Sequence, residues 1–150
     1  MAKIDKSIVI QAPIEKVFEF VTKPENFAKA QPPETGTKII TSPKGPPKVG
    51  NVWKMGMKAG GQAYEWENEV TEVIDNKRVS GRQKGGPFKK LEWTQSFEAS
   101  DGGTRFSMTS EYEMPYSIIG KIIDKLKVEK EMDKNFDHFM KKTKELIEKS

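Results

Sequence analysis

Few residues in this sequence could carry out acid–base chemistry. It contains no cysteine and one histidine, His138, which excludes thiol catalysis, disulfides, thiolate metal sites and histidine-based triads or zinc clusters. An acid or base beside the sheet face described below would have to be a tyrosine or a carboxylate. The candidates are Tyr64, Tyr112, Glu129 and Asp133. They form no recognisable catalytic constellation, so the sequence predicts no catalytic residue, metal site or cofactor and leaves enzymatic activity open.

A different combination of residues indicates a binding site. Between residues 53 and 114, apolar or aromatic residues alternate with polar ones, which is the pattern of half-buried strands. The mainly apolar face also holds Asn68, Gln95 and Ser110. A dry core avoids polar groups without partners, whereas a ligand pocket combines an apolar lining with a few polar groups. A cavity behind this face and a core whose polar groups are satisfied locally are therefore alternatives of equal weight.

The elements that would position these residues are seven predicted strands. Glycine, asparagine and aspartate turns separate most of them, which is typical of an antiparallel meander. The opposite face of the predicted sheet carries charged residues such as Glu65, Glu67 and Glu69 and is expected to face water. The predicted strands span residues 3–10, 37–41, 51–59, 62–74, 78–84, 88–99 and 104–114.

Helices are predicted at both ends of the chain. Ile14, Val17, Phe18 and Val21 have helical spacing, and a second short helix is predicted over residues 24–30. A long helix is predicted over residues 117–150, with an apolar stripe that would cover the inner sheet face. Glu129 and Asp133 fall close to this stripe. A helix that curves midway explains them, as does a helix that faces a cavity, and periodicity does not separate the two.

The composition narrows the class of protein. The net charge is +4, but the lysines of the last helix alternate with acidic residues, so we expect no nucleic-acid binding. No apolar run approaches the roughly 20 residues that span a bilayer, so we expect no membrane insertion. Asp5 and Lys6 interrupt any signal peptide, and with the absence of cysteine this favours the cytoplasm. The length predicts one domain, over residues 1–150.

The order of elements resembles the helix-grip fold of the START-like (SRPBCC) superfamily, in its polyketide cyclase/dehydrase-type branch. The resemblance covers nearly the whole chain. It rests on Ala12-Pro13-x-x-x-Val17-Phe18 and on the hairpin from Asp101 to Arg105, and these motifs specify a superfamily and no reaction. Residues 24–27, 49–51, 64–66 and 118–121 support it. The implied fold is α+β, a curved antiparallel sheet of about seven strands wrapped on a long C-terminal helix, with two short helices after the first strand.

The resemblance implies a cavity between sheet and terminal helix that binds a hydrophobic or aromatic small molecule. An enzyme acting on such a ligand and a module that binds other proteins or regulates chaperones remain alternatives, and a protein partner is unknown. After Phe27 the chain departs from the usual pattern, because many relatives carry tryptophan there, and this leaves the cavity entrance open. The residues predicted to bind the ligand are Met55, Met57, Tyr64, Trp66, Asn68, Trp93, Gln95, Met108, Ser110, Tyr112, Phe136 and Met140.

Overall fold

The computed structural model describes residues 2–59, 62–113 and 125–150. Seven strands form one antiparallel sheet in the order β1-β7-β6-β5-β4-β3-β2. The predicted meander is therefore confirmed, with the first strand added beside the last. The strands are β1 (Ala2–Ile10), β2 (Lys38–Thr41), β3 (Val52–Ala59), β4 (Gln62–Ile74), β5 (Arg78–Gly85), β6 (Lys90–Ser100) and β7 (Gly103–Glu113).

The described helices are α1 (Ile14–Val21), α2 (Pro24–Lys29), the 3₁₀ helix η1 (Pro33–Thr35) and α3 (Lys125–Glu148). The helix α1 buries Val17, Phe18 and Val21, as its spacing predicts. Pro24 occupies the start of α2, where its missing N–H group costs nothing. The two short helices are confirmed, and η1 was not predicted. The predicted start of the terminal helix at Ser117 and the last residue of the predicted seventh strand, Met114, lie outside the described residues.

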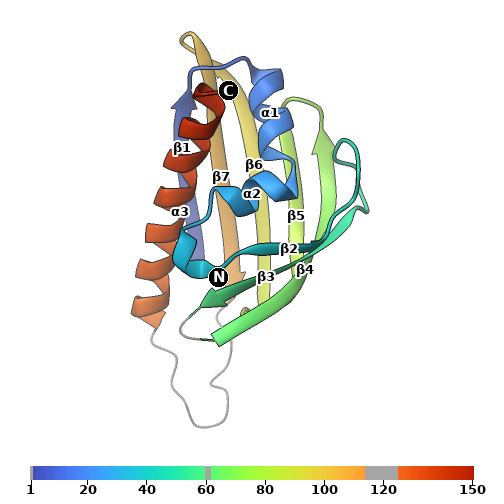
Figure 1. Ribbon diagram of the computed structural model, residues 1–150, viewed down its shortest axis with the longest axis vertical. Coiled ribbons are helices and arrows are strands. Elements are labelled where there is room, and N and C mark those ends of the chain that lie inside the picture. The colour runs from blue at the N-terminus through green and yellow to red at the C-terminus, as the bar shows by residue number, and fades with distance from the viewer. Residues whose placement is uncertain (1, 60–61, 114–124) are drawn as a thin grey trace.

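The sheet curves around the helices in a helix-grip α+β arrangement (Figure 1). The helix α3 runs alongside β1 at one edge of the sheet, while α1 and α2 lie in front of its middle strands. The prediction that the terminal helix alone covers the inner face is wrong, because α1 also packs on β6 and β7. The cover is shared because α3 follows the edge strand instead of crossing the sheet.

Polar contacts fix α3 along β1. Lys6 on β1 forms ion pairs with Asp133 at 2.7 Å and Asp137 at 3.2 Å, and the hydrogen bond to Asp133 raises the pKa of Lys6. Near the other end of α3, Lys144 Nζ donates to the Val9 carbonyl at 2.7 Å. The Gln11 N–H donates to Glu148 Oε2 at 2.8 Å and, with Lys144, lowers the pKa of Glu148. These contacts hold the helix at the edge of the sheet.

An aromatic core fills the space between β6, β7, α1 and the C-terminal half of α3. Phe106 is fully buried and stacks on Phe97 with ring centres 5.5 Å apart. Phe18 meets Phe97 edge-on at 5.1 Å, and Phe139 on α3 meets Phe106 at 6.3 Å. Burial of such large rings supplies much of the apolar driving force for folding. The packed core therefore lies over the β1–β7–β6 part of the sheet.

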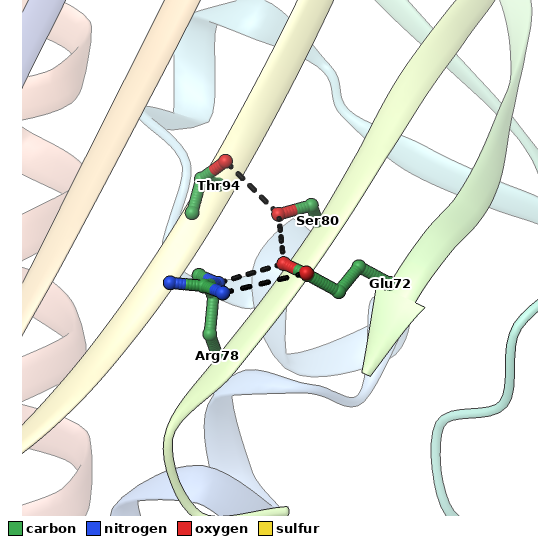
Figure 2. A network of polar contacts seen from close by, with 4 residues as sticks. All are labelled: Glu72, Arg78, Ser80 and Thr94. Carbon is green, nitrogen blue, oxygen red and sulfur yellow. Dashed lines mark hydrogen bonds and ion pairs between the residues drawn. The ribbon is translucent and has the colours of Figure 1, made fainter. Parts of the chain in front are cut away.

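The outer face of the sheet is polar, as the alternation predicts. Glu65, Glu67, Glu92, Arg105 and Glu111 are exposed there. Figure 2 shows one of its networks, in which Arg78 holds both carboxylate oxygens of Glu72 at 2.7 and 3.3 Å. Ser80 donates to Glu72 at 3.4 Å and lies 3.0 Å from the Thr94 hydroxyl. The outer polar groups of β4, β5 and β6 thus provide each other with partners.

Candidate binding pocket

A pocket of about 1030 Å³ lies on the inner side of the sheet and borders the packed core, because Phe139 belongs to the core and also lines the pocket. Residues of β3 to β7 form its wall, and α1, α2, η1, the loop between β2 and β3, and α3 also contribute lining residues. The helix α3 supplies Val128, Met132, Phe136 and Phe139. The stretch of α3 whose apolar stripe is interrupted therefore lies against the pocket. Most of its polar residues, such as Lys127 and Glu131, are exposed.

All of the residues predicted to bind a ligand line this pocket, except Tyr112 and Met140. Tyr112 is 1% exposed and its ring packs edge-on against Phe88 at 5.1 Å. Met140 is 3% exposed and belongs to the hydrophobic core. Both positions follow from alternation or helical spacing, but the core covers these side chains before they reach the pocket. Ligand binding by the others remains a prediction.

The three tryptophans of the chain, Trp53, Trp66 and Trp93, all line the pocket. Trp53 lies on the predicted inner face, although it was not among the predicted binding residues, and its ring centre is 5.8 Å from that of Trp93. Trp93 lies directly over Gly81, because a Cβ atom at residue 81 would be 2.2 Å from Trp93 Cζ2. Glycine at this register position on β5 makes room for the indole ring. Pattern analysis of the strand did not single out Gly81.

Asn68 is satisfied within the wall. Trp93 Nε1 donates to Asn68 Oδ1 at 3.2 Å, and Asn68 Nδ2 donates to Met55 Sδ at 3.2 Å. Sulfur is a weak acceptor, so the tryptophan bond is the main constraint on the amide. For Asn68, the alternative of a locally satisfied polar group is therefore correct.

Other polar groups of the wall lack such partners. Trp53 Nε1, Trp66 Nε1 and Gln83 Oε1 are buried, and none of them has a hydrogen-bond partner within the described structure. Gln95 is 6% exposed and Ser110 is 2% exposed, but their polar atoms are not among the buried atoms that lack a partner. An unpaired buried polar group costs roughly 1–3 kcal/mol.

The charged residues that the described part of the chain contributes to the pocket lie at its rim. All of these lining residues are exposed, and none of them belongs to the buried part of the wall. A charge moved into that wall would lose its hydration without an opposite charge to replace it. The pocket therefore suits a molecule whose buried part is neutral. The charged rim residues are Glu34, Lys58, Lys127, Glu131 and Lys134.

The segment that follows Phe27 borders the pocket. Phe27 lines it and packs against Phe139 with ring centres 5.0 Å apart. Gln31 and Thr35 also line it, and Thr35 Oγ1 donates to the Pro32 carbonyl at 2.8 Å, which fixes the turn of η1. Phe27 and the η1 turn therefore form part of the border of the pocket.

The acid–base candidates are not brought together. Tyr64 lines the pocket and its hydroxyl donates to Gln62 Oε1 at 2.9 Å. Tyr112, Glu129 and Asp133 are not among the described lining residues. Burial, followed by the charge of Glu129, raises the pKa of Tyr112. The side chain of Asp133 is 56% exposed and paired with Lys6, because this side of α3 faces β1.

The described ranges hold neither a metal-binding cluster nor a membrane-spanning helix. No group of three histidine, cysteine, aspartate or glutamate residues within them could hold a metal ion. None of the helices that the structure describes combines the length and apolar character needed to cross a membrane.

Comparisons with known proteins agree with the geometry. Among solved structures, the chain is similar to the Zhui aromatase/cyclase from Streptomyces sp. R1128, with a TM-score of 0.79 and 14% identity over 98% of this chain and 93% of that one. TTHA0849 from Thermus thermophilus gives a TM-score of 0.77 and 24% identity, covering 97% of both chains. The Aha1 dimer from Colwellia psychrerythraea gives a TM-score of 0.67 and 18% identity, covering 99% of this chain and 97% of that one. These likenesses establish the fold.

The family comparison covers more than the fold. No curated protein matches the sequence. A family model described as polyketide cyclase / dehydrase and lipid transport matches residues 1–148, which include every strand, both short helices and α3. The expected branch of the START-like superfamily is therefore confirmed, and this chain belongs to the polyketide cyclase / dehydrase and lipid transport family.

Proposed function

We propose that the protein binds or carries a hydrophobic or aromatic small molecule in the pocket between the sheet, α2 and α3. The observation that supports this most is the pocket itself, about 1030 Å³ in volume and lined by all three tryptophans. Ligand pockets commonly measure roughly 300–1,000 Å³ and are mainly apolar with a few polar groups. The description of the family, which includes lipid transport, agrees with a cargo of this kind.

Binding is favoured over turnover by the positions of the titratable groups. General acid–base catalysis needs a group within hydrogen-bonding reach of the reacting atom. Among the candidates only Tyr64 lines the pocket, and its hydroxyl already bonds to Gln62. The lining carboxylates, Glu34 and Glu131, are exposed at the rim. The wall thus offers shape and neutral polar contacts in place of a positioned acid and base.

Intrinsic fluorescence tests the proposal directly, because every tryptophan lines the pocket. We expect saturable quenching or a spectral shift on titration with at least one member of a panel containing a fatty acid, a sterol and a polycyclic aromatic compound. Native mass spectrometry should show the same complex with one ligand per chain. If no member binds, and protein isolated from its native host carries no small molecule, the proposal is wrong.

A pair of variants on α3 provides a matched control. Val128 lines the pocket, so Val128→Phe should occupy part of its volume and weaken binding by roughly tenfold. Leu126 lies on the same helix, is 60% exposed and is not a lining residue. Leu126→Phe should therefore leave affinity unchanged. Equal losses in both variants would place the ligand elsewhere on the protein.

A further inference from the structure

All of the net positive charge of the protein comes from one stretch of sequence. Residues 35–64 contain five lysines and no acidic residue, whereas the net charge of the whole chain is +4. Most of this stretch forms β2, β3 and the loop between them, and β2 is the edge strand of the sheet. The loop projects at the side of the sheet away from α3 (Figure 1). The lysines are Lys38, Lys44, Lys48, Lys54 and Lys58.

Most of these lysines are not neutralised by a neighbouring carboxylate. Apart from Lys54, they are exposed, and none of these other four forms an ion pair with another described residue. Lys54 pairs with Glu65 at 3.5 Å. On the same strand as Glu65, Glu67 and Glu69 lie opposite residues of β3 and β5, and Glu69 is held by Arg82 at 2.7 Å. The acidic residues of β4 therefore compensate the charges of β3 and β5, and the lysines of β2 and the loop keep theirs.

Exposed aliphatic side chains lie in the same part of the molecule. Ile40 on β2 is 41% exposed, Val49 in the loop 65% and Val52 at the start of β3 37%. They are three of the five large hydrophobic residues that are exposed in the described chain. Aliphatic residues beside lysines suit the interface of a membrane, where apolar groups enter the headgroup region and the charges stay above it. We call Lys38, Ile40, Lys44, Lys48, Val49 and Val52 the basic edge.

The composition of this stretch distinguishes among anionic partners. Binding of nucleic acid relies on arginine forks and on aromatic side chains that stack on bases. Residues 35–64 contain no arginine, and their two aromatic residues, Trp53 and Tyr64, line the pocket instead. An anionic lipid surface requires neither feature, because each lysine close to it acts as a point charge.

We propose that the basic edge attaches the protein to a membrane surface that contains anionic lipid. Its lysines lie over the anionic headgroups, and Ile40 and Val49 enter the headgroup region. Pro43, Gly45 and Pro47 of the same loop line the pocket, so attachment places this border of the pocket against the bilayer. Such contact needs no membrane-spanning helix. The inference goes beyond the proposed function and does not depend on it.

Sedimentation with lipid vesicles tests the attachment. The probes are vesicles of phosphatidylcholine alone and vesicles of phosphatidylcholine with about 30% phosphatidylserine, which carry the negative surface potential of an anionic leaflet. We expect the protein to sediment with the anionic vesicles and not with the neutral ones. High salt should release it, because salt screens the attraction between the lysines and the lipid.

Two pairs of lysines provide matched charge variants. Lys44→Glu combined with Lys48→Glu should weaken binding to the anionic vesicles by about 25-fold or more, since each lysine near the surface supplies about fivefold. Lys130 and Lys141 are exposed on α3, and neither forms an ion pair with another described residue. Lys130→Glu combined with Lys141→Glu changes the net charge equally. We expect this pair to change the affinity far less, because distant charges are screened.

A second pair of variants tests the same surface without a change of charge. Val49→Ser should weaken binding to the anionic vesicles by about threefold or more, because it removes an apolar side chain from the headgroup region. Leu126 is exposed to a similar degree on α3, at 60%. Leu126→Ser should leave the binding unchanged. Circular dichroism of each variant verifies that the fold is kept.

The outcomes separate this inference from the proposed function. Equal binding to both kinds of vesicle, binding to neither, or equal losses in the two lysine pairs would overturn the attachment. A preference for duplex DNA or polyglutamate over the anionic vesicles at the same salt concentration would assign the basic edge to a soluble polyanion and overturn it as well. Neither Lys44 nor Lys48 lines the pocket, so their variant should bind a small molecule as the wild type does, and the fluorescence titration without vesicles tests the proposed function by itself.

Discussion

The outer and inner faces of β4, β5 and β6 differ in whether their polar side chains have hydrogen-bond partners. On the outer face, Glu72, Arg78, Ser80 and Thr94 form a continuous network (Figure 2). On the inner face of the same strands, Trp66 Nε1 and Gln83 Oε1 are buried without a hydrogen-bond partner among the described residues. Water can also form hydrogen bonds with the exposed outer groups, in addition to those from their protein partners.

Because of this difference, residues on the two faces are expected to contribute differently to stability. The outer pairs are exposed and contribute little to stability individually. The inner residues are placed by tight constraints such as the contact between Gly81 and Trp93. Substitutions should therefore have large effects on the inner face and small effects on the outer face, and three predictions test this ordering.

The largest effect is expected at Gly81, on the inner face. A Cβ atom there would lie 2.2 Å from Trp93 and 2.7 Å from the Glu69 carbonyl oxygen, so movement of the ring alone does not relieve the clash. Gly81→Ala should lower the free energy of unfolding by about 3 kcal/mol, the upper end for overpacking. Urea unfolding followed by circular dichroism measures it.

The control is Gly56→Ala on β3. Its Cβ atom would meet the flexible end of Lys38 at 3.2 Å and the Tyr64 carbonyl oxygen at 3.4 Å. The Lys38 side chain can move aside, so we expect a change of less than about 1 kcal/mol. Equal losses at the two glycines would contradict the distinction between the faces.

An intermediate effect is expected from the inner hydrogen bond between Trp93 and Asn68. Asn68→Leu would leave Trp93 Nε1 buried without its acceptor, at a cost of about 2 kcal/mol in unfolding free energy. In a Trp93→Phe background the same change should cost clearly less, because the unpaired donor is gone. A double-mutant cycle by urea unfolding measures this coupling, and simple additivity would show that the bond does not stabilise the wall.

The smallest effect is expected on the outer face, from Glu72→Gln. Arg78 lowers the pKa of Glu72 below its ordinary value of 4.5 through their hydrogen bond. A lowered folded-state pKa contributes stability above pH 4.5, and this contribution disappears as the pH falls through the folded pKa. The stability difference between the wild type and Glu72→Gln should thus be small at pH 7 and shrink further toward pH 3.

Thermal unfolding across this pH range checks the sign. A difference that grew with acidification would contradict the assigned ion pair. High salt should also reduce the difference at pH 7, because the pair is exposed and therefore screened. The inner-face changes at Gly81 and Asn68 should depend much less on salt, since they act through packing and a neutral hydrogen bond.

The sequence by itself determined the elements and the faces. Turn residues such as Asp101 and Gly102 mark where strands end, and alternation assigns Trp66, Asn68 and Trp93 to one side. Both signals are local, because side-chain direction in a strand repeats every two residues whatever the rest of the chain does. The helix α1 was found for the same reason, from the spacing of Val17 and Phe18.

Only the tertiary structure decided which inner residues face the pocket and which face the core. Tyr112 and Met140 fit the pattern as well as Trp66 does, yet Phe88 covers Tyr112, and Met140 lies in the core. The place of α3 along β1 depends on contacts such as Lys6 with Asp133, between residues far apart in the chain. The curvature of the sheet and the placement of the helices arise from such long-range packing, which local sequence periodicity does not encode. The pocket wall and its unpaired polar atoms could therefore be identified only in the folded molecule.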